Sequence, residues 1–193
     1  MKKTVILLFG GRSSEYEVSL SSAFGALENI DTEKYNVVKV GITHDGKFYL
    51  YEGENSLIPE NKWLAEGKCT PLSLDLEKGC FTAEDREIRP DAVLPMIHGK
   101  NCEDGTLQGM LTLMKIPVAG CGCTSSAVCM DKAFAKAIIN SETGINQAKA
   151  VVIRAEDYTP DTAVSFREKC EKQLGYPVFV KPANAGSSVG VTK

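Results

Sequence analysis

The first 43 residues alternate between strand-like and helix-like hydrophobic patterns, and this order constrains the fold more than any other feature. Residues 4–9 form a continuous run of strand-favouring residues that ends at Gly10-Gly11. Residues 17–30 then carry apolar side chains at helical spacing, namely Val18, Ala23, Leu27 and Ile30. Residues 36–43 return to a strand pattern. A strand–helix–strand order predicts parallel strands joined by a right-handed crossover, and hence a Rossmann-like α/β domain.

The sheet is expected to continue, with a polar insertion at its edge. Asp45-Gly46 is typical of a hairpin turn leading into residues 47–51. Residues 52–90 are mostly polar and contain only short strand-like pieces, at 72–76 and 80–82. The elements that complete this part are a strand at 91–96, a helix at 106–115 and a short strand at 116–119.

The pattern changes near residues 120–145, where we place a domain boundary. Residues 125–142 are expected to form one helix, and strands at 148–153 and 177–181 then flank an amphipathic helix at 161–174. The predicted domains are residues 1–125 and residues 126–193. Because the second part has too few residues to bury a core of its own, we expect it to be the truncated beginning of a larger domain.

Composition excludes several classes of function. A net charge of −3 provides no basic field for nucleic acid, and no apolar run approaches the roughly 20 residues that span a bilayer. The seven cysteines are odd in number and contain no C-x-x-C pair, which favours ordinary reduced thiols in a cytoplasmic protein. Cys102 is the exception, because it lies in a loop rich in functional groups and could be modified there.

The first candidate site follows the first strand. Glycines at this position let the backbone turn sharply and approach a ligand, and Ser13 or Ser14 could cap the following helix. The pattern is not G-x-G-x-x-G, so the dinucleotide fingerprint is absent. Glu15 and Glu17 would repel phosphate and would suit an ammonium group. The alternative is that both glutamates only complement the positive end of the helix dipole.

The second candidate site is the loop after residues 91–96, which begins at His98. In open α/β sheets ligands bind at the carboxyl ends of the strands. His98 could bind a carboxylate while Glu103 fixes the tautomer of its imidazole, and Asp104 could cap the next helix. The alternative is a histidine that is satisfied by backbone groups at a strand end.

The third and fourth candidates lie in the second part. Lys181 precedes the loop Gly186-Ser-Ser-Val-Gly190, which offers a positive charge and several amide donors for nucleotide phosphates. Lys132 stands near a helix start and could reach a second phosphate. The alternatives are a plain hairpin turn for the loop and a surface lysine for Lys132.

Taken together and in this order, the four segments resemble the D-alanine–D-alanine ligases of the ATP-grasp superfamily, a family that includes the vancomycin-resistance ligases. The matching segments are residues 9–20, 98–109, 126–132 and 179–190. The resemblance covers the whole chain. It implies a parallel-sheet, Rossmann-like N-terminal (pre-ATP-grasp) domain followed by the start of an ATP-grasp domain.

The resemblance also implies a reaction. Such enzymes use ATP and Mg²⁺ to phosphorylate the carboxylate of a first D-alanine, and the amine of a second D-alanine or D-serine then attacks the acyl phosphate. The product serves peptidoglycan synthesis. By resemblance, Glu15 binds the first ammonium group and Ser187 helps to hold Glu15. His98 and Glu103 face the first substrate. Lys132, Lys181, Ser187 and Ser188 contact ATP.

Several expectations accompany this reading. By resemblance, the magnesium ligands and the second-substrate pocket lie in parts that this chain does not contain, so the chain is expected to be inactive alone. The family generally forms cytoplasmic homodimers. Two alternatives are a non-catalytic amino-acid- or partner-binding module and a different ATP-grasp carboxylate–amine ligase. The loops at Glu15 and His98 argue against the second alternative.

Overall fold

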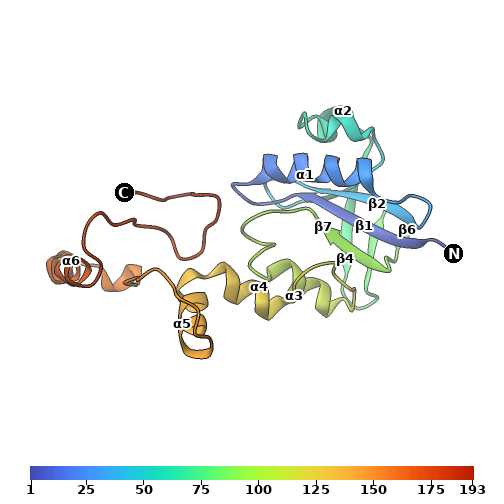
Figure 1. The fold of residues 1–193 in the computed structure, drawn as a ribbon. Helices are drawn as coiled ribbons and strands as arrows, with labels where there is room; N and C mark the ends of the chain where they lie inside the picture. Colours follow the sequence, from blue (N-terminus) through green and yellow to red (C-terminus); the bar gives the residue numbers. More distant parts are fainter. The chain divides into compact units, whose positions relative to one another are not determined.

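The computed structural model describes all residues from 1 to 193. The chain separates into two compact units, Met1–Ala127 and Val128–Lys193. Figure 1 shows the sheet in the first unit and mainly helices in the second. No helix in the chain combines the length and apolar character needed to cross a membrane.

The first unit is built on one seven-stranded sheet with the order β6-β5-β4-β3-β2-β1-β7. Its strands are β1 (Lys3–Gly10), β2 (Tyr35–Ile42), β3 (Phe48–Tyr51), β4 (Cys69–Asp75), β5 (Cys80–Ala83), β6 (Arg86–Ile88) and β7 (Ala92–Pro95). β1 pairs in parallel with both β2 and β7, and the other neighbours are antiparallel. The predicted α/β fold is confirmed, with its parallel part limited to β2, β1 and β7.

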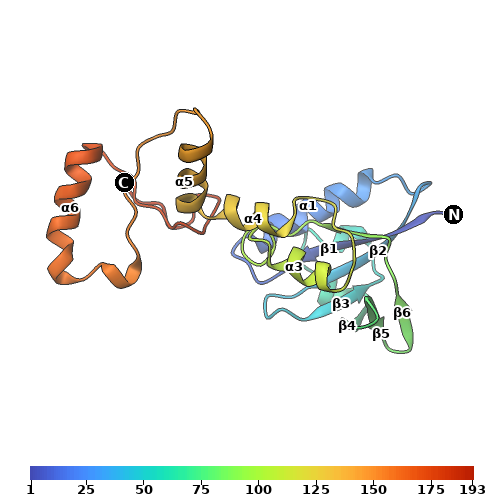
Figure 2. The ribbon, with the colours of Figure 1, turned by 90° about the horizontal axis from the view of Figure 1, so that it is seen from below.

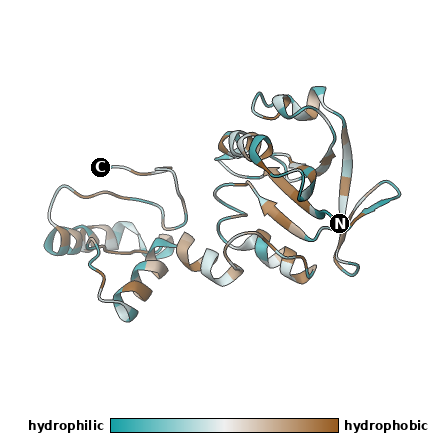
Figure 3. Cartoon of the chain, turned by 45° about the vertical axis from the view of Figure 1, so that its right-hand side comes forward, coloured by the Kyte–Doolittle hydropathy of each residue, from teal (hydrophilic) through white to brown (hydrophobic).

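Both faces of the sheet are covered, which explains the continuous apolar run in β1. Ile6 and Leu8 face one core, which α3 (Thr106–Leu113) closes with Leu107 and Leu111. The alternate strand residues, Leu7 and Phe9, face a second core with α1 (Tyr16–Asn29), α2 (Trp63–Glu66) and Ile58, which follows η1 (Asn55–Leu57). Figure 1 shows α1 and α3 on opposite sides of the sheet, and Figure 2 gives a second view of these layers. In Figure 3 hydrophobic colour is concentrated on the central strands.

The buried stripe of α1 differs in part from the prediction. The buried residues are Tyr16, Ser19, Leu20 and Ala23, whereas Val18 is 49% exposed. The helical period fits two neighbouring lines of side chains on α1, one that includes Val18 and one that starts at Tyr16. The sheet buries the line that starts at Tyr16. Leu27 packs against the same core as a partly buried side chain, as predicted.

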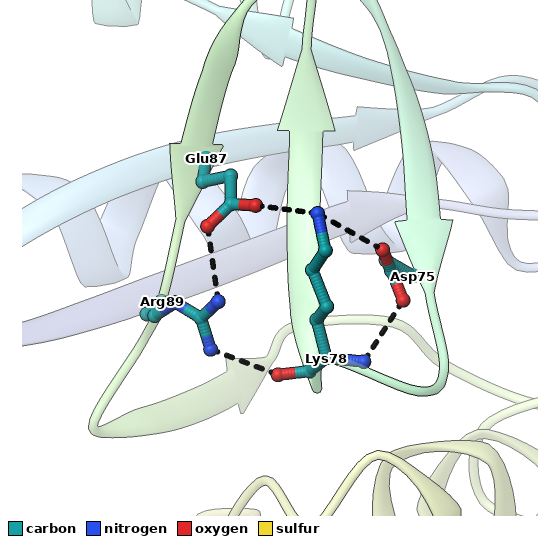
Figure 4. Close-up of polar contacts among 4 residues, drawn as sticks. All are labelled: Asp75, Lys78, Glu87 and Arg89. Carbon is teal, nitrogen blue, oxygen red and sulfur yellow. Dashed lines mark hydrogen bonds and ion pairs between the residues drawn. The ribbon is translucent and has the colours of Figure 1, made fainter.

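The polar insertion forms the antiparallel edge of the sheet, and an ion network joins its strands (Figure 4). Lys78 Nζ lies 2.9 Å from Glu87 Oε1 and 3.8 Å from Asp75 Oδ2. Arg89 Nη2 lies 3.0 Å from Glu87 Oε2, and Arg89 Nη1 donates a hydrogen bond to the Lys78 carbonyl. Because these side chains are exposed, water and salt screen the network, and its contribution to stability is small.

The second unit contains helices but no sheet. Its helices are α5 (Lys132–Glu142), η2 (Ala155–Asp157) and α6 (Pro160–Leu174), and α4 (Cys123–Met130) runs into it from the first unit. The helix expected at 125–142 was wrong as a single element, because Asp131 interrupts it. The Asp131 carboxylate accepts hydrogen bonds from the amides of Ala133 and Phe134 and thereby caps α5.

The strands expected at 148–153 and 177–181 were also wrong for this chain. Only a single bridge forms, between Val180 and Thr192, and the strand expected at 116–119 is likewise reduced to a bridge between Val93 and Val118. None of residues 128–193 is buried. A strand needs neighbours that pair with it and a face to cover, and this unit supplies neither. The expectation that the second part buries no core of its own is confirmed.

Candidate functional site

Two loops leave the sheet side by side at the carboxyl ends of β1 and β7. The strands are parallel and in register, with Leu8 opposite Pro95, so the segments that follow them emerge at the same edge. The Met96 amide donates to the Leu8 carbonyl at 2.8 Å. The side chain of Asn101 donates to the Arg12 carbonyl at 2.9 Å and ties one loop to the other. The sheet therefore brings the first two candidate sites together.

Glu15 stands at the N-terminus of α1, where it is only 8% exposed. The expected caps were wrong: Glu15 itself is the N-cap residue, without a side-chain capping bond, and Ser13 Oγ accepts the Glu15 N–H at 3.0 Å. The carboxylate lies against the backbone of Gly99. A β-carbon built on Gly99 would stand 3.0 Å from Glu15 Oε1 and 2.8 Å from Ser13 Oγ. Gly99 also has a φ of +71°, which L side chains rarely adopt.

Glu17 differs from Glu15 in its surroundings. Its side chain is 71% exposed, and its carboxylate lies 4.0 Å from His44 Nε2. The two carboxylates that the sequence presented as a pair are therefore distinct. Glu15 is held inside the strand-end site, and Glu17 lies in the exposed first turn of α1.

His98 has a protein partner on each side of its ring. Nε2 lies 2.8 Å from Ser22 Oγ, and Nδ1 lies 3.7 Å from Glu103 Oε1. The other oxygen of Glu103 accepts the Gly99 N–H at 2.9 Å. Glu103 thus lies on the Nδ1 side of the ring, where a carboxylate favours a proton on that nitrogen. Sequence reasoning did not find Ser22, because no motif distinguishes it from the other serines of α1.

Asp104 organises the turn that leads into α3. Its carboxylate accepts the amides of Asn101 at 2.8 Å and Thr106 at 3.0 Å. Partial burial alone would raise the pKa of Asp104, but these backbone donors, with Lys100 nearby, outweigh burial and lower it. The capping tendency expected from sequence is therefore present, although Gly105 is the residue at the N-cap position.

Cys102 does not fit the expectation of a modifiable thiol. It is 3% exposed and belongs to the core beneath α3. Burial, with smaller contributions from Glu103 and Asp104, raises the pKa of its thiol to about 12. Because the thiolate is the reactive form, Cys102 is a structural core residue. The exposed cysteines of the chain are Cys121, Cys123 and Cys129.

In the second unit Lys132 lies against the segment that precedes the Gly186–Gly190 loop. Its amide donates to the Ala183 carbonyl at 3.1 Å, and its Nζ donates to the carbonyls of Ala183 and Ala185. Lys132 is thus held beside the third candidate segment, and its contact with a phosphate stays a prediction. Lys181 follows the bridge at Val180 and is exposed.

Ser187 and Ser188 form the centre of a tight turn. The Val189 amide donates to the Gly186 carbonyl at 2.9 Å, and the two serines have φ values of +47° and +60°. Two successive non-glycine residues in this region cost energy, and such strain clusters at functional loops. The turn fits both the phosphate-binding loop and the plain hairpin turn, and its contact with ATP stays a prediction. The predicted link between Ser187 and Glu15 joins the two units and stays a prediction.

The chain contains no group of three His, Cys, Asp or Glu side chains placed to hold a metal ion.

These features define an α/β protein whose candidate site residues lie at the carboxyl edge of its parallel strands. A family model described as the D-ala D-ala ligase N-terminus matches residues 4–121, and a second, described as the C-terminus of the same ligase, matches residues 139–193. The chain belongs to the D-alanine–D-alanine ligase family. This result confirms the predicted resemblance and agrees with a Rossmann-like domain followed by the start of an ATP-grasp domain.

Individual relatives agree with this assignment. The D-alanine–D-alanine ligase of Thermoanaerobacter sp. (strain X514) is 44% identical over all of this chain and 54% of its own length. The VanG D-Ala:D-Ser ligase of Enterococcus faecalis is 40% identical with a TM-score of 0.88, over 100% of this chain and 55% of that one. The Bacillus anthracis D-alanine–D-alanine ligase complexed with ATP is 27% identical with a TM-score of 0.59, over 95% of this chain and 48% of that one. The chain spans about half the length of the curated relatives that it matches.

Proposed function

We propose that this chain is the N-terminal portion of an ATP-dependent ligase that joins D-alanine to a second D-alanine or to D-serine. The observation that carries the proposal is the placement of Glu15. A carboxylate only 8% exposed lies against Gly99 in the loop that begins with His98, at the carboxyl edge of parallel strands. A small amino acid, with its ammonium and carboxylate groups, suits this combination of side chains.

In this proposal the first unit binds the first D-alanine. Glu15 takes the ammonium group, because a carboxylate shielded from water attracts a cation more strongly than an exposed one. The same charge keeps phosphate away from the turn at Gly10-Gly11. His98, held from its Nδ1 side by Glu103, faces the carboxylate of this substrate.

The second unit is proposed to bind ATP. Lys132 and Lys181 neutralise the charge of the phosphates, and the turn at Ser187 and Ser188 covers them with its amide and hydroxyl donors. A carboxylate oxygen of the first D-alanine attacks the γ-phosphorus, and ADP leaves. The amine of the second substrate then attacks the acyl carbon and expels inorganic phosphate, so that a peptide bond replaces the acyl phosphate bond. The protein contributes mainly position and charge neutralisation.

The cellular role is proposed from the family. We expect a cytoplasmic enzyme that supplies a dipeptide for peptidoglycan synthesis and acts as a homodimer. Magnesium would neutralise charge on the ATP phosphates, and we expect its ligands in the part of the relatives that this chain does not match. D-Serine is proposed as an alternative second substrate because the VanG relative is a D-Ala:D-Ser ligase.

A direct assay tests the proposal. By the complete ligase we mean this chain continued to the length of its relatives, by its own downstream coding sequence or by the matching segment of the Thermoanaerobacter enzyme. Given ATP and either D-alanine only or D-alanine together with D-serine, the complete ligase should release one ADP and one phosphate for each dipeptide formed. L-Alanine should not replace D-alanine. Absence of ligation by a folded complete ligase would favour a non-catalytic module. Ligation only with other carboxylates and amines would favour a different ATP-grasp ligase.

A further inference from the structure

One face of α1 contacts the loop after β7 through three residues. Glu15, Ser19 and Ser22 are spaced by four and three positions, so they lie along one side of the helix. Ser19 is fully buried: its hydroxyl accepts the Gly10 N–H at 2.8 Å and donates to the Met96 carbonyl at 2.6 Å. This contact joins the helix to the ends of β1 and β7. The helix therefore has a fixed position relative to the loop.

The same face contacts the loop at two further points. Glu15 lies against Gly99, and Ser22 Oγ lies 2.8 Å from His98 Nε2. Ser22 is half-buried in the helix, so its hydroxyl is presented from a rigid element. One helix thus carries the proposed ammonium ligand at its N-terminus and a partner of His98 two turns later.

We propose that Ser22 is a positioning residue for the first substrate, acting through His98. With a proton on Nδ1, facing Glu103, the Nε2 atom accepts a hydrogen bond from the Ser22 hydroxyl. When both ring nitrogens carry protons, Nε2 donates to the Ser22 oxygen instead. A hydroxyl serves in either direction, so the ring keeps one orientation in both protonation states. The expected effect of Ser22 on substrate binding rests on the proposed function. The expected effect of Ser22 on the His98 ring does not.

The structural consequence can be measured in the 193-residue chain by ¹⁵N NMR of its two histidines, His44 and His98. A His44→Gln variant assigns the signals. In Ser22→Ala the His98 Nε2 resonance should move toward that of a nitrogen without a hydrogen-bond donor, and the fraction of the tautomer with the proton on Nδ1 should change. The His44 signals should stay where they are. An unchanged His98 spectrum would overturn the proposal.

The kinetic consequence is measured in the complete ligase. Ser22→Ala should raise the KM for the first D-alanine roughly three- to tenfold, as expected for one hydrogen bond, with the KM for ATP within about twofold of wild type. Ser22→Thr keeps the hydroxyl and should restore both the KM and the His98 spectrum. Ser21→Ala makes the same change at the neighbouring exposed position of α1 and should alter neither.

The outcomes separate this inference from the proposed function. If the complete ligase is active and Ser22→Ala matches Ser21→Ala in KM and in the His98 spectrum, Ser22 has no positioning role and the ligase proposal stands. If the complete ligase is inactive while Ser22→Ala still changes the His98 spectrum, the proposed function fails, although the link between Ser22 and His98 is real. A loss of folding in Ser22→Ala that Ser22→Thr does not rescue would assign Ser22 to packing and overturn the proposal.

Discussion

The carboxylate of Glu15 lies so close to the backbone of Gly99 that a β-carbon at position 99 would stand 3.0 Å from Glu15 Oε1. The contact joins the N-terminus of α1 to the loop after β7. These segments are more than 80 positions apart in the chain, and the parallel pairing of β1 with β7 brings them together.

Replacing Gly99 by alanine should disturb the site and the backbone together. The φ of +71° disfavours alanine, and the new methyl group would press on Ser13 and Glu15. We expect a loss of about 1–3 kcal/mol in the free energy of unfolding and a raised KM for the first D-alanine. Gly175→Ala is a matched control, because its φ is +70° and nothing lies within 4 Å of the added carbon. Equal effects on KM in the two variants would refute a role for the contact at position 99.

Glu15→Ala in the complete ligase should raise the requirement for the first D-alanine far more than that for ATP. Loss of a charged hydrogen-bond partner predicts a roughly 10- to 100-fold higher KM for the amino acid, with the KM for ATP within about twofold. Glu17→Ala, two residues away in the exposed first turn, should have little effect. Steady-state kinetics with each substrate varied in turn checks both. An unchanged dependence on D-alanine in Glu15→Ala would remove the ammonium-binding role.

Cys102 should resist alkylation in the folded protein. With a thiol pKa raised to about 12, the side chain stays a thiol at pH 8, and it is also buried. Cys121, Cys123 and Cys129 are exposed and should react with N-ethylmaleimide first. Peptide mass spectrometry after timed labelling gives the order. Labelling of Cys102 as fast as that of Cys121 would contradict its place in the core.

Asp104→Ala should destabilise the first unit by about 1–2 kcal/mol at neutral pH, because the amides of Asn101 and Thr106 lose their acceptor. The folded pKa of Asp104 lies below its usual value of 3.8. Its contribution to stability is therefore present above pH 3.8 and is lost as the pH falls through the folded pKa. Urea unfolding followed by the fluorescence of Trp63, the single tryptophan, should show the gap between wild type and variant narrowing in acid. A gap that is the same at neutral and acidic pH would count against the hydrogen bonds to the ionised carboxylate.

The 193-residue chain by itself is expected to bind ATP weakly and to form no dipeptide. Its second unit has no buried side chain and only one isolated β-bridge, so Lys132, Lys181 and the Ser187–Ser188 turn lack a rigid support. Calorimetry with ATP and a phosphate-release assay with D-alanine test both statements. Phosphate release that depends on both ATP and D-alanine would show that the expectation of inactivity is wrong.

The elements of the first unit could be predicted from sequence because the patterns that indicate them are local. The apolar run of β1 and the Asp45-Gly46 turn each predict an element without reference to the rest of the chain, and the strand–helix–strand order restricts how those elements combine. Even so, the prediction of which side of α1 is buried was wrong at Val18. Two neighbouring stripes fitted the helical period, and only packing against the sheet selects one.

The strands of the second unit were predicted wrongly because a strand forms only with a pairing partner, and the local sequence pattern does not show whether a partner is present. Residues 148–153 and 177–181 have strand-like composition, yet without neighbouring strands they form at most the Val180–Thr192 bridge. The break between α4 and α5 has a local cause. The Asp131 side chain satisfies the first amides of α5, and this signal was present in the sequence but was outweighed by the apolar pattern on either side.

The sequence by itself determined the α/β class, the family and the identity of the candidate residues, since each of these follows from short segments in a fixed order. Only the tertiary structure decided how those residues are used. It separated Glu15 from Glu17, buried Cys102, and brought Ser22 to His98. Such differences depend on contacts between segments tens of residues apart, which form when the sheet and the helices pack.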